Sequence, residues 1–207
     1  MCLQQCRQNE DAICCDTCNI WSHRKCNGIN NARYKVISED TVSSWHCPIC
    51  EILKLEKCGV YKWPEILKIL EKLHKDGYLH NAVCRKLLDS FEPIKSASPK
   101  LSKVSHKTDL NAERVLQEFQ MSLLRPLCAT GNGNCLYNTI SILLVGDETR
   151  NVELRARTFL ELKSNVEFYT SDKIKKDLFT ASGQTYSESL GNCSNYSYSS
   201  AWHIQAS

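Results

Sequence analysis

The thirteen cysteines of this chain carry its most informative chemistry, and their distribution is uneven. Nine of them lie within the first 58 residues, and His23 stands among them. Thiolate and imidazole groups are the ligands of structural zinc sites, and cysteine pairs separated by two residues fold readily around one ion. The cysteine count is odd, and the first seven residues lack the apolar core of a secretory signal peptide. We therefore favour zinc in a reducing compartment over disulfides.

Regular spacing picks out six candidate ligands. They form three pairs, each with two residues between its members: Cys15 with Cys18, His23 with Cys26, and Cys47 with Cys50. Two zinc tetrahedra need eight ligands. Two more are therefore expected upstream, where Cys2 and Cys6 are the candidates besides Cys14.

The ligand order of four cysteines, one histidine and three cysteines resembles the PHD finger. Trp21, two residues before His23, and the run Trp45-His46-Cys47-Pro48 are further PHD-like details, and the resemblance covers about residues 1–52. It implies a small, irregular finger with a short β-hairpin and two cross-braced zinc sites. The implied ligand sets are Cys15, Cys18, Cys47 and Cys50 at one site, and His23 and Cys26 with two upstream cysteines at the other.

Two registers stay open for the upstream ligands. In the first, Cys2 and Cys6 both bind zinc, although three residues separate them where the family has two. In the second, Cys2 is the family's second ligand, the first precedes Met1, and Cys6 either substitutes for it or lies nearby. We expect two zinc ions, or one if the second site is broken.

The resemblance also implies a binding partner for the finger. PHD fingers bind peptides such as the histone H3 tail, and some hold methyl-lysine in an aromatic cage. Trp21 occupies a cage-wall position, whereas Ala12 stands where such readers often carry a second aromatic. We therefore expect a protein or peptide partner, with the H3 tail as a candidate, and a nuclear rather than cytoplasmic location. The alternative is a structural zinc module in which Trp21 packs beside His23.

A second site of chemical interest is Cys135, which a glycine-rich turn delivers to the start of a predicted helix. A helix N-terminus favours thiolate and can hold an oxyanion. A buried, inert cysteine that opens a core helix is the alternative. The segment 130–141, with Glu153-Leu154-Arg155 and the run 198–202, resembles the OTU family of cysteine deubiquitinases. The resemblance implies an α+β domain, Cys135 as candidate nucleophile and ubiquitin as a partner.

Two features of this region depart from the family. Asn132 stands in place of the acid of the motif, and the family's catalytic histidine lies well past a helix that begins near a residue like Trp202. His203 is the only histidine after Cys135, and its position is that of a helix-entry residue. A general base contributes about 10²–10⁴-fold to rate. We therefore expect an OTU-like domain that is incomplete at its C-terminus and inactive as it stands.

Apolar periodicity and linker composition divide the chain. Pro64 suits a first helical turn, Asp76-Gly77 suits a stop, and a second short helix is expected before residue 92. The inward positions of the two helices are Ile66, Leu67, Leu70 and Leu73, then Val83, Leu87, Leu88 and Phe91. Further helices are expected over 111–123, 135–145 and 149–163. The expected zones are a PHD-type finger over 1–58, a helical connector over 60–92, a flexible basic linker over 93–110 and the OTU-like domain over 111–207.

The overall composition excludes several classes of protein. With 207 residues, 42% hydrophobic and 24% charged, the chain is of an ordinary globular type, and no run is long enough to span a membrane. A net charge of +3 gives no reason to expect nucleic acid. We favour a zinc-binding PHD-finger protein that tethers an interaction module to an OTU-like domain. The alternatives are a deubiquitinase-type cysteine protease that lacks its catalytic end, and an adaptor without either family activity.

Overall fold

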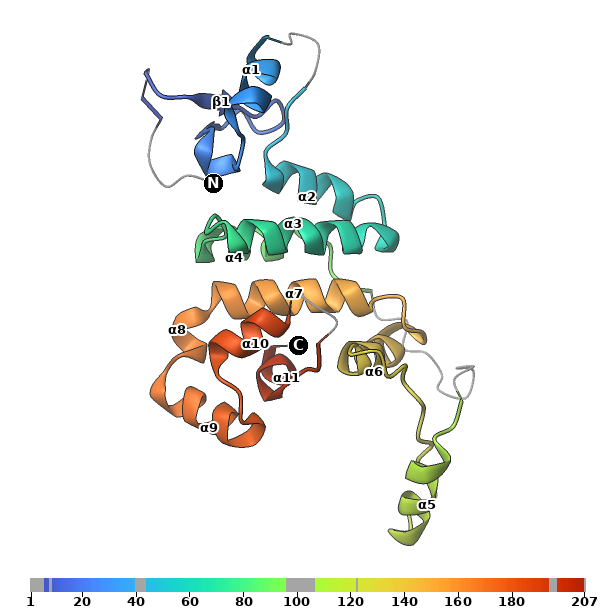
Figure 1. Cartoon of the computed structure of the whole chain (residues 1–207). Helices are drawn as coiled ribbons and strands as arrows, with labels where there is room; N and C mark the ends of the chain where they lie inside the picture. Colours follow the sequence, from blue (N-terminus) through green and yellow to red (C-terminus); the bar gives the residue numbers. More distant parts are fainter. Residues whose placement is uncertain are drawn as a thin grey trace.

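The computed structural model describes residues 6–7, 9–39, 44–95, 107–121, 123–193 and 197–206. Cys2 and most of the expected linker lie outside these residues. Within them the protein is mostly helical, with a small finger at one end (Figure 1). None of the described helices is both long and apolar enough to cross a bilayer.

The finger is built on an antiparallel hairpin of two short strands, β1 (Ala12–Cys14) and β2 (Trp21–His23). Ile13 pairs with Ser22, and both side chains are buried beneath the sheet. Because side chains alternate along a strand, Trp21 falls on the opposite face. The 3-10 helix η1 (Lys25–Asn27) and α1 (Asn31–Glu39) complete the described part of the finger. The short β-hairpin expected from sequence is therefore present.

Three longer helices follow α1 along the chain: α2 (Pro48–Glu56), which carries Cys50, then α3 (Trp63–Lys75) and α4 (Asn81–Ser90), with the 3-10 helix η2 (Val60–Lys62) before α3. Pro64 lies in the first turn of α3, and the helix ends at the expected Asp76-Gly77 turn. Most of the predicted inward positions are buried, and Leu67 and Leu88 are partly buried against the same core. The apolar spacing therefore predicted both helices and their inward faces correctly.

The central element is α7 (Asn151–Ser164), which packs against α3 and α4 on one side and α6 (Cys135–Val145), α10 (Tyr186–Asn192) and α11 (Ala201–Ala206) on the other (Figure 1). One hydrophobic cluster runs from Cys15 and Cys47 in the finger through Ile66 of α3 to Phe159 of α7 and Trp202 of α11. The helices over 60–92 thus share a core with both neighbouring regions. The short helix α8 (Val166–Tyr169) and α9 (Asp172–Ser182) follow α7.

A half-buried charged group joins α7 to α3 and to the end of α4. Arg157 of α7 lies 5.4 Å from the ring centre of Trp63 and 5.2 Å from that of Phe91. Its guanidinium also donates to Glu153, whose carboxylate is buried and also accepts from Arg150. A guanidinium over aromatic rings and beside a carboxylate is stabilised on both sides. This contact fixes the two helical layers against each other.

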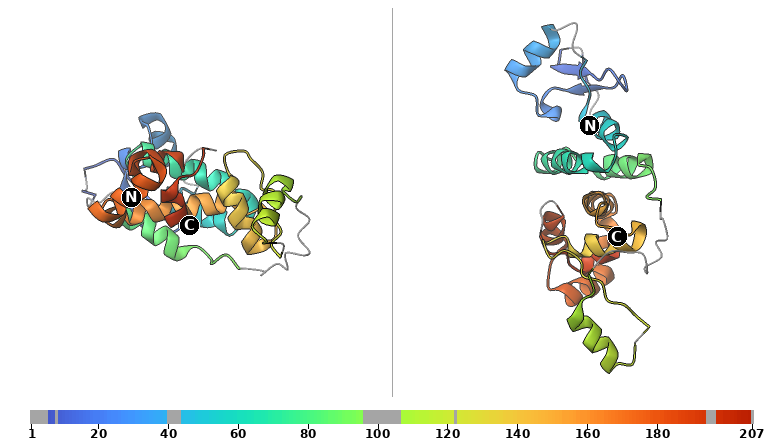
Figure 2. Two further views of the ribbon diagram at one scale, coloured as in Figure 1. Left: turned by 90° about the horizontal axis from the view of Figure 1, so that it is seen from below. Right: turned by 90° about the vertical axis from the view of Figure 1, so that its right-hand side faces the viewer.

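The region expected to be an α+β domain differs from that expectation. In residues 107–121, 123–193 and 197–206 the described elements are helices, and the strand content is limited to an isolated bridge between Thr108 and Leu127. The helix expected over 111–123 is α5 (Leu110–Glu118), which Asp109 caps by accepting from two backbone N–H groups. It ends early because Gln120 adopts a positive φ of 58°. Helix α5 projects from the rest of the molecule (Figure 2).

Candidate functional site

Four cysteines converge where the finger meets α2. The Sγ atoms of Cys15, Cys18, Cys47 and Cys50 all lie within 4.8 Å of one another. The distance between the sulfurs of Cys18 and Cys47 is 4.0 Å. A tetrahedral zinc ion with Zn–S bonds of about 2.3 Å separates its sulfur ligands by about 3.8 Å. The cluster therefore has the size and donor set of a structural zinc site.

Local backbone structure brings the two cysteine pairs together. After β1 the chain turns so that the N–H of Asn19 donates to the carbonyl of Cys15 at 2.8 Å, and Asn19 adopts a left-handed φ of 54°. Asp16 holds the second segment through two hydrogen bonds to the backbone of Trp45, one to its N–H at 2.6 Å and one to its carbonyl at 3.0 Å. Both members of the second pair thereby reach the first at the N-terminus of α2.

The thiols of this cluster differ in acidity. Burial opposes ionisation of Cys15, but backbone N–H groups of Cys47, Cys18 and Thr17 point at its sulfur and together lower its pKa to about 6. Burial, together with the neighbouring thiols, raises the pKa of Cys47 and Cys50. Four thiolates in this space would repel one another without a cation between them. The donor chemistry fits a divalent, thiophilic metal, and zinc would supply folding free energy here.

The second predicted zinc site is only partly assembled in the described residues. The Sγ of Cys26 lies 3.9 Å from Nδ1 of His23, as two ligands of one ion would. The other ring nitrogen, Nε2, lies 2.8 Å from the carboxylate of Glu10, an arrangement that orients metal-binding histidines. Cys6 is half-buried, and Cys2 lies outside the described residues. Among the described residues, the group of three or more metal-binding side chains that the structure brings together is the four-cysteine cluster, so the second site is not shown.

Glu10 was not among the site residues predicted from the sequence, although it contacts His23. The N–H of Arg7 donates to its carboxylate, and this bond and His23 hold the pKa of Glu10 below its usual range. A single acid thirteen residues before a histidine carries no recognisable spacing, so only the three-dimensional structure identifies it.

Trp21 is the main exposed aromatic of the finger's sheet. Its side chain is 60% exposed on β2, opposite Cys14 across the strand pair. Ala12 lies opposite His23 on the same face of the sheet. Ala12 adds no aromatic wall there, so within the described strands the indole has no facing ring.

The loop before α6 places Cys135 at the first position of that helix. Gly133 adopts a positive φ of 81°, and the buried Asn134 is the N-cap residue. The thiol of Cys135 is half-buried, so the alternative of a fully buried core cysteine does not describe it. Asn132 accepts through its side chain from the N–H of Asn134 at 3.2 Å and from the amide of Asn138 at 3.4 Å. Asn132 therefore shapes the loop.

Arg155 of α7 holds this loop in place through hydrogen bonds. Its buried guanidinium donates to the side chain of Asn134 at 2.6 Å and to the carbonyl of Gly133 at 2.9 Å. It also donates to the carbonyls of Asn192 and Ser197, and it lies 4.6 Å from the ring centre of Tyr137. A buried arginine needs such dense pairing. Arg155 therefore holds the Cys135 loop to two segments near the C-terminal end of the chain.

His203 lies in the first turn of α11, as expected, and it is fully buried. Its Nδ1 accepts from the N–H of Ser200 at 2.8 Å, and its ring packs edge-on to Tyr137. Burial is the main cause that lowers the pKa of His203 to about 4. Catalytic bases work best with a pKa near the operating pH. An imidazole in this setting is a weak base at neutral pH.

Each of the two regions matches a known protein family. Residues 1–54 match the family described as Pygopus, PHD-type zinc finger, and residues 126–190 match the family described as Vertnin, OTU domain. The first match contains the four-cysteine cluster, and the second contains Cys135 and Arg155 but ends before His203. No solved structure matches the chain. The chain thus joins a PHD-type zinc-binding finger to an OTU-like region.

Proposed function

We propose that this chain is a zinc-dependent interaction protein, in which the PHD-type finger binds a peptide of a partner protein and carries the OTU-like region as an attached unit. The supporting observation is the exposure of Trp21. A tryptophan that served only to pack the finger would be buried, yet this indole is 60% exposed on a sheet whose neighbouring Ile13 and Ser22 are buried. Exposed aromatics of this kind act as anchors in binding surfaces.

The hairpin suggests how a peptide would bind. In the described residues the sheet contains only β1 and β2, so each strand keeps one edge without a strand partner. An extended peptide can add a strand to such an edge, with main-chain hydrogen bonds for affinity and side-chain pockets for specificity. The histone H3 tail is the candidate ligand, and a nuclear location accompanies that proposal. A fluorescent fusion of the full chain that stays out of the nucleus would count against it.

The experiment is a calorimetric titration of the zinc-loaded full chain with an unmodified H3 N-terminal peptide. Trp21→Ala should weaken binding by at least about tenfold, since an anchoring tryptophan is worth about 2 kcal/mol. Tyr61→Ala is the matched control, because Tyr61 is an exposed aromatic (71%) outside the finger's sheet. Equal affinities for the two variants would contradict the proposal, as would binding that survives removal of zinc.

A second candidate function is a cysteine protease acting on ubiquitin conjugates. The half-buried thiol of Cys135 at the N-terminus of α6 is the observation that favours it. Against it stand Asn132 at the position of the acid and the low basicity of His203. We therefore rank it below peptide binding.

A further inference from the structure

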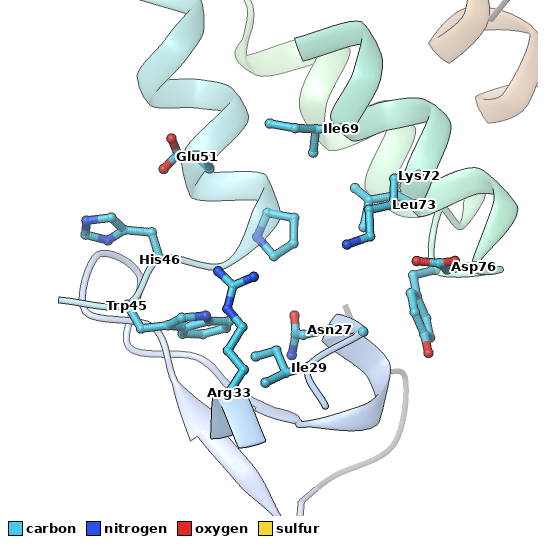
Figure 3. Close-up of a pocket in the computed structure, with 13 residues that line it drawn as sticks. Asn27, Ile29, Arg33, Trp45, His46, Glu51, Ile69, Lys72, Leu73 and Asp76 are labelled. Atoms are coloured by element: carbon cyan, nitrogen blue, oxygen red, sulfur yellow. The ribbon is translucent and has the colours of Figure 1, made fainter. Parts of the chain in front are cut away.

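A cavity of about 210 Å³ lies between the finger and the helices behind it (Figure 3). The finger supplies residues of η1, α1 and the Trp45 segment, and the opposite side consists of the start of α2 and the C-terminal half of α3. The cavity is distinct from the sheet face that carries Trp21. It is too small for a drug-sized ligand, which needs about 300–1,000 Å³. Its size suits one or two side chains of a peptide.

The walls of this cavity are fixed rather than loose. Ile29 of the finger and Leu73 of α3 are both buried where they line it. The hydroxyl of Tyr78, just after α3, donates to the carbonyl of Lys25 in η1, so the two sides are tied together. A preformed pocket binds without the cost of ordering its own walls.

Two solvent-exposed cations border the cavity from opposite sides. Figure 3 shows the guanidinium of Arg33 entering from the finger and the ammonium of Lys72 entering from α3. In the described part of the chain neither side chain forms an ion pair. An arginine fork and a lysine point charge together match a carboxylate.

The other charged or titratable groups of the lining lie to the sides of the space between Arg33 and Lys72 (Figure 3). Glu51 points away from Arg33 on the outer side of α2 (Figure 3). Asp76 is the C-cap residue of α3 through its backbone N–H, and its carboxylate lines the cavity beside the left-handed Gly28 turn, where an added Cβ would lie 3.6 Å from Oδ2. Nδ1 of His46 lies 2.9 Å from the hydroxyl oxygen of Thr17, within hydrogen-bond distance. The space between Arg33 and Lys72 is therefore bordered by these two cations and by apolar side chains, with the carboxylate of Asp76 at its margin.

We propose that this cavity is a docking site for a partner peptide that carries an aspartate or glutamate next to an apolar residue. The carboxylate lies between Arg33 and Lys72. The apolar side chain packs against Ile29, Ile69 and Leu73. The finger then has a second binding surface, and because both the finger and α3 line it, it exists only while the finger sits on the helices.

The test is an NMR titration of the zinc-loaded, ¹⁵N-labelled full chain with acetyl-Leu-Glu-amide. The matched ligand is acetyl-Leu-Gln-amide, which has the same shape without the charge. We expect saturable shifts at the indole N–H of Trp45 and along α3 around Lys72. Binding of the glutamine peptide should be at least about fivefold weaker, because the charged hydrogen bonds are lost.

Substitutions test whether the peptide binds at this cavity. The double variant Arg33→Gln, Lys72→Gln should reduce affinity for the glutamate peptide by at least about fivefold, while Lys68→Gln, an exposed lysine of α3 outside the cavity, should not change it. Trp21→Ala should also leave this binding unchanged, which separates it from the proposed function. Equal binding of both peptides, shifts centred on Trp21, no saturable binding, or an unaffected double variant would each overturn the proposal.

Discussion

The thiol of Cys135 and the imidazole of His203 occupy contrasting settings. Cys135 is half-buried at the start of an eleven-residue helix, behind a loop that Arg155 holds in place. His203 is fully buried, and its pKa is lowered to about 4. A nucleophile without a base of matched pKa gains little rate, because proton removal is then not assisted.

We therefore predict that the full chain does not hydrolyse a fluorogenic ubiquitin conjugate. Cys135 should nevertheless be alkylated by iodoacetamide sooner than Cys84 and Cys193, since burial raises the pKa of each of those thiols to about 12. Peptide mass mapping over time reports the order of labelling. Cleavage that is abolished in Cys135→Ala would disprove the prediction, and His203→Ala would then show whether His203 is the base.

A second prediction concerns methyl-lysine. Trp21 offers one wall, and Ala12 offers no second ring, so a quaternary ammonium is only partly enclosed. We expect trimethylation of the H3 peptide to improve affinity by no more than about tenfold, or ~1.4 kcal/mol. Calorimetry of the two peptides side by side measures the ratio. A larger preference would show that an aromatic outside the hairpin completes a cage.

Among the elements, α7 connects the two helical layers through Arg157. Replacing Arg157 by Ala removes the cation between Trp63 and Phe91 and leaves Glu153, 3% exposed, with Arg150 as its remaining partner in the ion triad. We expect a loss of about 2 kcal/mol in the free energy of unfolding. Arg150→Ala is the control, since it breaks the other ion pair of Glu153 without touching a ring. It should cost about 1 kcal/mol or less. Urea unfolding gives both values, and equal losses would refute a role for the stacking.

Some features of the helices could be predicted from the sequence, and others could not. The apolar spacing over residues 60–92 predicted α3 and α4, because a helix face follows from local periodicity. The resemblance to the PHD finger, which the cysteine spacing carries, implied the four-cysteine cluster, and that cluster is present. By contrast, charged side chains usually lie on the protein surface, yet Glu153 and Arg155 are both buried. The partners of Arg155 lie on other segments, the Cys135 loop among them, so no local pattern could reveal its burial. Glu153 has local partners, Arg150 three residues before it and Arg157 four residues after it, but its burial follows from the packing of α7 against other helices.

At the scale of the whole molecule, the finger and the helical layers depend on different sources of stability. The finger has few buried apolar side chains, Ile13 and Ile29 among them, so we expect it to require metal in order to fold. Helices α3, α4 and α7 bury a larger shared cluster. We predict that a strong chelator unfolds residues 1–58 and leaves the helices over 111–207 intact.

Hydrogen exchange with and without chelator tests this difference. Protection should be lost around β1 and β2 and retained in α7, and added zinc should restore the finger. Loss of protection throughout the chain at the same chelator concentration would contradict the independence of the two regions. Retained protection in the finger would contradict its dependence on metal.

The most direct measurement is the metal content of the purified full chain, compared with that of Cys47→Ser and Cys6→Ser. Eight ligands predict about two zinc ions per chain. Cys47→Ser should disable the four-cysteine site, whereas Cys6→Ser should leave that site loaded and cost less stability. A wild-type chain with no zinc and with its cysteines oxidised to disulfides would contradict the zinc centre on which the proposed function rests.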